Sequence, residues 1–411
     1  MPDTTTRDFK VYYPPHDVPE PAFSENNIPV FFGCDDRFLP HVMVVIASIM
    51  EHASADNNYD LLVLVTGVGR ERMAVCLDWM RRYPNASLRF IDIERMVEEA
   101  GRGNFKATKM YSAAIYFRFF APTVFAKYDK ITYQDGDVLF FDDVACFFKH
   151  DMQGMLIAGC HDYISENLVW KTPEIEKFWR EQLGKEPGDS YFCSGGVVMD
   201  LAKMRERESE KALIEKMYRI EGSNLFDQDV MNAVFHKQVS FIDTKWNCLD
   251  WMASPAEESL NYDLLDERGL RLVREAREDI KVLHYAERKP WTVEYIGDNE
   301  GLYWRYAKMS PFYDEVLAAL NADCGFFGLA KKYLVLALQT WNFGFRKMIA
   351  GASGRAKNAR RLHLVRQRKK AILKQMRRMG YFGMGDGKSD PLRPVGEMAV
   401  VMEKENDGNG K

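Results

Sequence analysis

The segment "KITYQDGDVLFFDD", Lys130 to Asp143, places Asp135 and Asp137 one glycine apart within an apolar run. Two like charges about 4 Å apart, at an effective dielectric of about 20, repel by roughly 4 kcal/mol. The pair therefore requires a bound cation, a proton or full solvation. A lone Asp-x-Asp is usually a solvated surface turn, but the apolar neighbours here disfavour solvation. A divalent cation held by both carboxylates and a third ligand would remove the repulsion and leave open positions for phosphate oxygens.

The segments around this pair predict an α/β fold with a mainly parallel sheet, because apolar strand-like runs alternate with stretches of helical length and spacing. We predict strands at 27–34, 59–67, 87–93, 130–140, 155–160, 194–200 and 279–286, and helices at 39–53, 71–83, 112–121 and 227–235. Ligands of such sheets bind beyond the carboxyl ends of the strands. Asp35 and Asp36, the Asp135–Asp137 pair and His284 are therefore predicted to converge on one rim.

The segment "VLHYAERKPW", Val282 to Trp291, supplies a candidate third ligand. It places His284 at the end of an apolar run, before a Lys-Pro-Trp turn. A lone histidine there is more often a structural residue. Together with the upstream Asp-Gly-Asp, it indicates a carboxylate, carboxylate and imidazole site suited to Mn²⁺, with Mg²⁺ as the alternative.

The chain resembles glycosyltransferase family 8, the group that contains bacterial lipopolysaccharide galactosyl- and glucosyltransferases and glycogenin. The resemblance runs in one order from about Ile28 to Trp291, through "FFGCDDRF", "AAIYFRFFAPTVFAKYDKITYQDGDVLFFDD", "YFCSGGVVMDL", "DQDVMNAVF" and "HYAERKPW". It implies a GT-A type nucleotide-sugar-binding fold, a mainly parallel mixed sheet flanked by helices. It also implies retaining transfer of glucose or galactose from a UDP-sugar to a glycan or glycolipid acceptor, in cell-surface polysaccharide or lipopolysaccharide synthesis.

The resemblance also implies roles for individual residues. Asp135, Asp137 and His284 would hold the metal against the donor diphosphate. The implied substrate-binding residues are Asp35 with its neighbour Asp36 at the uridine, Arg118 and Cys193 at the donor sugar, and Lys289 at the diphosphate.

Three further residues are implied in catalysis. Asp227 would hydrogen bond donor hydroxyls, Gln228 would lie beneath the anomeric carbon, and Asp162 would lie near the acceptor. From the residues alone, Asp227 is equally explained as a helix cap and Arg118 as a helix-surface charge. Front-face attack guided by the leaving phosphate and double displacement through Gln228 or Asp162 both remain open.

The chain departs from the family pattern at several positions. Cys193 stands where the family usually has an asparagine, and a thiol is a poor hydrogen-bonding substitute for an amide. Arg37 replaces a small or amide residue, and Ala286 or Glu287 replaces a glycine. These changes make the identity of the donor sugar harder to predict, but they leave the predicted metal ligands and the predicted transfer reaction unchanged. A nucleophilic Cys193 is disfavoured because nothing in the sequence supplies a base beside it.

Composition and sequence signals restrict the class of protein. A chain of 411 residues that is 46% hydrophobic can bury a large core. The amino terminus has no apolar run behind a basic start, and the seven dispersed cysteines fit reduced thiols, so we expect a cytoplasmic protein. A nucleotidyltransferase is disfavoured because no Gly-rich phosphate loop is present. A non-catalytic nucleotide-sugar or membrane-binding module with a degenerate site remains the alternative.

The carboxyl-terminal part has a separate charge pattern. Residues 331–378 contain fifteen Lys and Arg and no Asp or Glu, so the rest of the chain carries −19 of the total charge of −4. In the basic segment 326–380 an apolar stripe is predicted on one face of a helix, formed by Leu362, Val365, Ile372, Met376 and Met379. This pattern is typical of a helix lying on an anionic membrane. The aromatic tract 333–345 favours a membrane over nucleic acid, and it is shorter than the ~20 residues that span a bilayer.

These observations predict the organisation of the chain and its location. We expect an amino-terminal extension at 1–27, a glycosyltransferase domain at 28–300, a helical connector at 301–325, a basic membrane-associating segment at 326–380 and a mobile tail at 381–411. The protein would lie on the inner face of the cytoplasmic membrane.

Overall fold

The computed structural model describes residues 9–101, 105, 112–253, 265–293, 295, 297, 299–323 and 326–349, with Leu362, Val365, Arg366, Lys369, Ile372 and Leu373. The chain divides into two compact units. The first comprises Met1–Ala253 and Asn261–His284, and the second comprises Ser254–Leu260 and Tyr285–Lys411.

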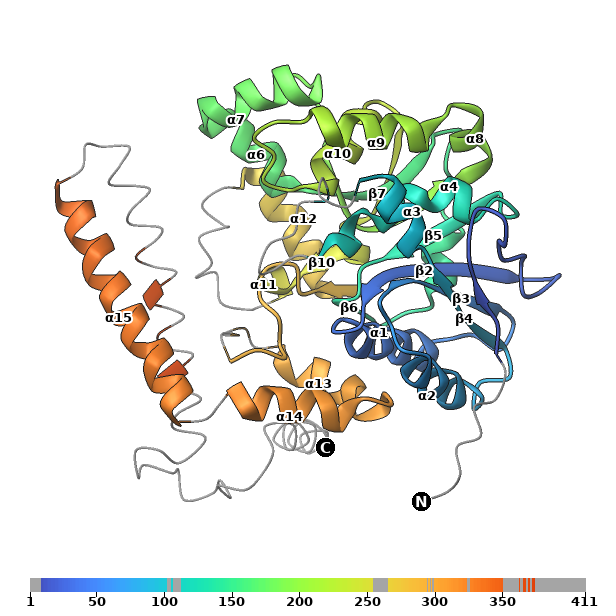
Figure 1. The fold of residues 1–411 in the computed structure, drawn as a ribbon. Helices are drawn as coiled ribbons and strands as arrows, with labels where there is room; N and C mark the ends of the chain where they lie inside the picture. Colours follow the sequence, from blue (N-terminus) through green and yellow to red (C-terminus); the bar gives the residue numbers. More distant parts are fainter. Residues whose placement is uncertain are drawn as a thin grey trace, which may run out of the picture. The chain divides into compact units, whose positions relative to one another are not determined.

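An eight-stranded sheet forms the centre of the first unit (Figure 1). Its strands are β1 (Val11–Tyr12), β2 (Asn27–Asp35), β3 (Asn58–Thr66), β4 (Ala86–Asp92), β5 (Lys130–Gln134), β7 (Ile157–His161), β8 (Phe192–Asp200) and β9 (Val239–Ile242). Their order is β1-β4-β3-β2-β5-β8-β7-β9, and β8 alone runs antiparallel to its neighbours. The predicted mainly parallel mixed sheet is confirmed.

Helices lie on both sides of this sheet. Figure 1 shows α1 (Leu39–Glu51) and α2 (Arg70–Met80) on one side, and α4 (Ala121–Val124), α8 (Leu201–Glu206) and α9 (Ser209–Arg219) on the other. The remaining helical elements are α3 (Glu94–Glu99), η2 (Ala113–Phe120), α5 (Val144–Phe148), α6 (Tyr163–Lys171), α7 (Pro173–Phe178), η3 (Trp179–Leu183), α10 (Asp227–Val234), η4 (Thr244–Asn247), α11 (Asp250–Ala253) and α12 (Glu267–Glu278).

The helix predicted at 112–121 is different in the structure. It is a 3₁₀ helix, η2, and the short helix α4 follows directly with Pro122 in its first turn. Proline is tolerated there because the first turn of a helix needs no intrahelical N–H donor. Pro122 therefore begins a new helix instead of ending helical structure.

A small second sheet corrects two of the predicted strands. It consists of β10 (Cys248–Leu249), β11 (Val282–His284) and β6 (Val138–Phe140), in the order β10-β11-β6. The predicted strand 130–140 is thus two strands in two sheets, and the predicted strand 279–286 is the short β11 outside the main sheet. The chain leaves the main sheet at Asp135, so the two aspartates lie in the turn between the sheets.

The regular elements of the second unit, among its described residues, are helices. It contains α13 (Glu300–Met309), α14 (Tyr313–Asp323) and α15 (Phe326–Ile349). None of the helices described is both long and apolar enough to cross a bilayer.

The described residues of the predicted apolar stripe are helical, but the prediction that they contact a membrane is wrong. Leu362, Val365 and Ile372 are only 7%, 6% and 0% exposed, so they pack inside the protein. Met376, Met379 and the predicted tail 381–411 lie outside the described residues. The five-part division of the chain stays a prediction.

Candidate metal and donor site

The turn between β5 and β6 positions the two aspartates. A Cβ atom on Gly136 would lie 2.7 Å from Phe38 Cε1 and 2.9 Å from Val42 Cγ2. Real Cβ atoms do not approach so closely, so close packing against α1 requires the glycine between the two carboxylates. The turn is also tied to β8, because the Asp135 N–H donates to the Gly195 carbonyl at 2.7 Å.

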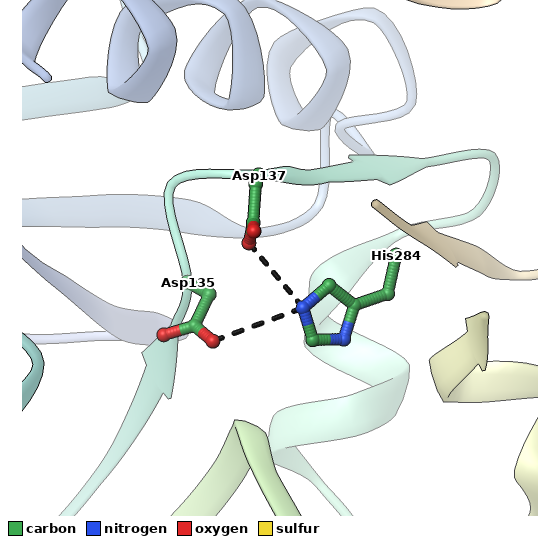
Figure 2. Close-up of side chains that lie close together, drawn as sticks. All are labelled: Asp135, Asp137 and His284. Atoms are coloured by element: carbon green, nitrogen blue, oxygen red, sulfur yellow. Dashed lines mark ion pairs between the residues drawn. The ribbon is translucent and has the colours of Figure 1, made fainter. Parts of the chain in front are cut away.

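Strand pairing brings His284 to this turn. Strands β11 and β6 are antiparallel, and their register places His284 opposite Val138, the residue after Asp137. His284 Nε2 lies 3.3 Å from Asp137 Oδ1 and 3.8 Å from Asp135 Oδ2 (Figure 2). The three potential ligand atoms lie within 4.8 Å of one another, the one such group among the described residues. The predicted convergence is thus correct for these three residues. His284, however, lies on a strand of the small second sheet and not on the main sheet.

The protonation of His284 tests whether this group fits a metal. Its Nδ1 lies 2.8 Å from Asn247 Oδ1, an oxygen that only accepts, so the ring proton is assigned to Nδ1. Nε2 then directs a lone pair toward two carboxylates. Burial lowers the pKa of His284, but the charge and hydrogen bond of Asp137 outweigh it and raise the pKa to about 10. A proton on Nε2 thus satisfies the carboxylates, and a divalent cation would do the same, so the residues fit a divalent metal.

Asn247 is the residue that fixes this imidazole. Replacing Asn247 by alanine should weaken Mn²⁺ affinity by about 10–100-fold, because partners of a ligating histidine fix its tautomer and orientation. Asn247→Asp keeps the accepting oxygen and should retain most of the affinity. Calorimetric Mn²⁺ titration measures the difference, and equal affinities of Asn247→Ala and the unaltered protein would exclude this positioning role.

Arg118 lies buried beside the metal group. Its side chain is 1% exposed, and its Nη2 donates to Asp135 Oδ1 at 2.7 Å and to the Tyr133 hydroxyl at 2.8 Å. The Arg118 guanidinium also lies 3.8 Å from the centre of the Tyr133 ring, and its Nη1 donates to the Ser194 carbonyl. The interpretation of Arg118 as a helix-surface charge is therefore wrong.

Asp227 extends this buried charge network. Its Oδ2 lies 3.4 Å from Arg118 Nε and accepts from the Ser194 hydroxyl at 3.1 Å. Burial raises the pKa of Asp227 to about 6, although Arg118 opposes the shift. Asp227 is the first residue of α10, and the N-cap is Phe226, without a side-chain cap. Asp227 is therefore not the helix cap that its position suggested.

The charges of this cluster do not balance within the protein. The three carboxylates of Asp135, Asp137 and Asp227 face the single guanidinium of Arg118. With His284 protonated one negative charge remains, and when His284 gives up that proton to bind a metal two remain. Uncompensated buried charges are strongly unfavourable. One divalent cation would balance them.

Gln228 and Asp162 form a second network beside the first. Gln228 Oε1 accepts from the Ser194 N–H at 2.9 Å, and Gln228 Nε2 donates to Asp162 Oδ2 at 2.9 Å. Asp162 also caps α6, because it accepts from the Ser165 N–H at 3.0 Å and the Ser165 hydroxyl at 2.7 Å. Burial raises the pKa of Asp162. Both residues are thus fixed by hydrogen bonds, and Ser194 links them to Asp227.

Cys193 lies beside the metal group. It is 9% exposed, and it is one of the groups that raise the pKa of the His284 imidazole. The sequence supplied no base for this cysteine, whereas the fold supplies an imidazole. Asn247 and Asp137 already engage that imidazole, which makes His284 a metal ligand candidate more than a base.

The remaining predicted residues lie outside the ligand group. Asp35 ends β2 and accepts from the Phe38 N–H at 3.0 Å and from Arg37 at 3.3 Å. Asp36 forms an ion pair with Arg72 of α2 at 3.0 Å. Lys289 belongs to the second unit, where its Nζ donates to the carbonyls of Tyr285 at 2.7 Å and Ala286 at 3.2 Å. Their roles toward a donor stay predictions.

Several residues of the site were not predicted from the sequence. They are Tyr133, Ser194, Gly195, Asn232 and Asn247, which hold the charged groups or the strand β8 in place. A Cβ on Gly195 would lie 3.0 Å from both Asp135 Oδ2 and His284 Nδ1, so only glycine fits. The glycines of "SGG" were a usable signal, because glycine in a strand often marks a close approach. Asn247, in "KWNC", has no such signal.

A mixed, mostly parallel sheet flanked by helices, with an Asp-x-Asp turn and a histidine at its edge, defines a glycosyltransferase of the GT-A type. The family model described as Glycosyl transferase family 8 matches residues 29–294, and the chain belongs to this retaining family.

Relatives and solved structures agree with this assignment. Glycosyltransferase GlyF of Streptococcus pneumoniae is 24% identical over 76% of this chain and 69% of its own length. The apo structure of the bifunctional glycosyltransferase WbbM aligns with a TM-score of 0.64 at 25% identity, over 73% of this chain and 52% of WbbM. The galactosyltransferase LgtC, solved with donor and acceptor sugar analogues, aligns with a TM-score of 0.56 at 22% identity, over 69% of this chain and 96% of LgtC.

Proposed function

We propose that this protein transfers a hexose, glucose or galactose, from a UDP-sugar to a glycan or glycolipid acceptor, with retention of the anomeric configuration. The observation that carries the proposal is the Asp135–Asp137–His284 group, whose two carboxylates and imidazole lie close enough together to hold a divalent cation. Mn²⁺ or Mg²⁺ suits two carboxylates and an imidazole. When bound, such a metal supplies the positive charge that stabilises a departing diphosphate.

The protein's own residues would prepare the site around that metal. Arg118 orients Asp135 by a hydrogen bond and holds Asp227 by charge, while Asn247 orients His284. Asp227 would hydrogen bond donor hydroxyls, and Asp35 and Asp36 would contact the uridine. Lys289 would bind the diphosphate, where an ammonium stabilises oxygens that lose a bond to carbon.

The Gln228–Asp162 network bears on the displacement mechanism. The carbonyl oxygen of Gln228 already accepts a backbone N–H, and both oxygens of Asp162 accept hydrogen bonds. An oxygen that accepts such bonds is a weaker nucleophile, and donation from Gln228 holds Asp162 at the edge of the site. These contacts favour front-face attack over a covalent intermediate on either residue, with Gln228 as a positioning group beneath the anomeric carbon.

The acceptor and location are part of the same proposal. An acceptor linked to lipid would be met at the inner face of the cytoplasmic membrane, in cell-surface polysaccharide or lipopolysaccharide synthesis. The basic segment 326–380, with its fifteen cations and no acid from 331 to 378, supports attachment to an anionic membrane rather than to nucleic acid.

UDP release from a panel of UDP-sugars, measured with Mn²⁺ and with a chelator, tests this function. We expect release from UDP-glucose or UDP-galactose only with metal, and an NMR spectrum of the product with the same anomeric configuration as the donor. No release from any donor, although UDP binds, would favour the non-catalytic alternative. Release of pyrophosphate from a nucleoside triphosphate would contradict the proposal.

Cys193 gives a separate prediction about donor choice. Replacing Cys193 by asparagine restores a hydrogen-bonding amide at a buried position beside the metal group, so the ratio of kcat/KM for UDP-glucose and UDP-galactose should change by about tenfold or more. Cys146→Asn, at an exposed cysteine, is the matched control and should leave the ratio unchanged. An unchanged ratio in Cys193→Asn would exclude a role of this position in specificity.

A further inference from the structure

Helix α15, which Figure 1 shows as a ribbon, has several large apolar side chains that are exposed to solvent. Leu334 and Leu338 are each 61% exposed, Trp341 is 74% exposed and Val335 is 46% exposed. Leu334, Leu338 and Trp341 follow one another at spacings of four and three residues, so they share one face of the helix. We call these three residues the α15 outer face.

The opposite side of α15 packs within its own unit. Leu329 is fully buried. The ammonium of Lys369 lies over the Tyr333 ring, with Nζ 4.9 Å from the ring centre. The buried Leu362, Val365 and Ile372 belong to the same unit. The described apolar residues of the basic segment are thus divided. Those at 362–372 are buried, whereas the α15 outer face remains at the surface.

The charge around the α15 outer face indicates what it contacts. Lys331, one turn before Leu334, and Arg366 are exposed, and no acidic residue occurs from 331 to 378. A second copy of this chain would bring two strongly positive segments together. Nucleic acid would pair with the cations but leave the leucines in water. An anionic bilayer offers phosphates to the cations and an apolar layer to the leucines, and Trp prefers this boundary.

We propose that the α15 outer face lies in the headgroup region of an anionic bilayer, with the helix parallel to the surface and Lys331 at the lipid phosphates. The proposal rests on the membrane attachment proposed above and deepens it, because it assigns attachment to α15 instead of to the buried stripe at 362–372. The two leucines and the tryptophan insert, and the cations make the attachment sensitive to salt.

Flotation with vesicles of phosphatidylcholine alone, and of phosphatidylcholine mixed with phosphatidylglycerol, tests the assignment. We expect the full chain to float only with the anionic vesicles, and less at high salt. The double variant Leu334→Gln/Leu338→Gln should lower the partition coefficient by about tenfold or more. The control Gln339→Ala/Asn342→Ala, at exposed polar positions of the same turns, should bind normally. Both variants should keep the melting temperature of the full chain, because the replaced side chains are exposed.

Trp341 gives a second measurement. The difference in fluorescence between the full chain and Trp341→Phe should shift to the blue when anionic vesicles are added. Equal flotation of the leucine variant and the full chain, or an unshifted Trp341 difference spectrum, would overturn the proposal. A leucine variant that changes only the oligomeric state would overturn it in favour of a second copy.

The outcome can be separated from that of the proposed transfer activity. UDP release to a soluble acceptor sugar should be unchanged in the leucine variant. For the leucine variant we therefore expect lost flotation with intact UDP release. If the full chain floats but releases no UDP, the proposed glycosyl transfer is wrong and the membrane contact of α15 is not.

Discussion

Replacing Asp137 by alanine is expected to lower turnover with the UDP-sugar donor by at least about a hundredfold, because the divalent cation would lose one of its three protein ligands. Asp137 Oδ1 lies 3.3 Å from Nε2 of His284, another of these ligands. Asp135→Ala should have the same effect. Neither variant should unfold, because Arg118 keeps its ion pair with Asp227 and His284 keeps one of the two aspartates in each variant. Steady-state UDP release and thermal melting measure the two results.

Asp142 supplies a matched control for this loss of charge. It lies in the same segment but forms an ion pair with Lys281 at 2.8 Å, and it is not in the ligand group. Asp142→Ala should retain normal turnover. Near-normal turnover of Asp137→Ala at saturating Mn²⁺ would show that the ligand assignment is wrong.

Replacing Arg118 by methionine is expected to reduce the free energy of unfolding by about 3–5 kcal/mol, because the change leaves the buried carboxylate of Asp227 and the partly buried carboxylate of Asp135 without their shared cation. Without the guanidinium, the pKa of Asp227 should rise further above about 6, since the charge of Arg118 lowers it more than any hydrogen bond does. Urea unfolding without added metal measures the destabilisation.

Two further variants make this result specific. Arg37→Met removes an exposed arginine whose partner is Asp35 and should change stability little. The double variant Arg118→Met/Asp227→Asn should recover part of the loss, since it removes one of the stranded charges. Unchanged stability in Arg118→Met would contradict the charge network described here.

The main sheet could be predicted from the sequence because its strands are long and apolar. Strands β2 and β3 are nine-residue runs buried along nearly their whole length, and such runs alternating with helices predict parallel pairing. The three-residue strands β6 and β11 carry too few residues for a periodic signal, so the second sheet was missed. The metal group was predicted from chemistry, because clustered carboxylates require a cation whichever sheet supplies the histidine.

The rest of the site depends on contacts that sequence patterns do not encode. Asn247 reaches His284 through the pairing of β10 with β11, and Ser194 joins three functional groups through its backbone and hydroxyl. The contacts of the apolar residues in the basic segment could not be predicted from the sequence pattern either. Periodicity predicted one apolar face for 362–379, but it could not say whether that face meets the protein or a membrane.

Counting bound Mn²⁺ shows whether Asp135, Asp137 and His284 together hold one divalent cation. Electron paramagnetic resonance of free Mn²⁺, titrated against the protein with UDP present, gives the number and affinity of sites. We predict one site per chain in the full protein and no such site in His284→Ala, whose fold should persist. The same stoichiometry and affinity in both proteins would contradict the account.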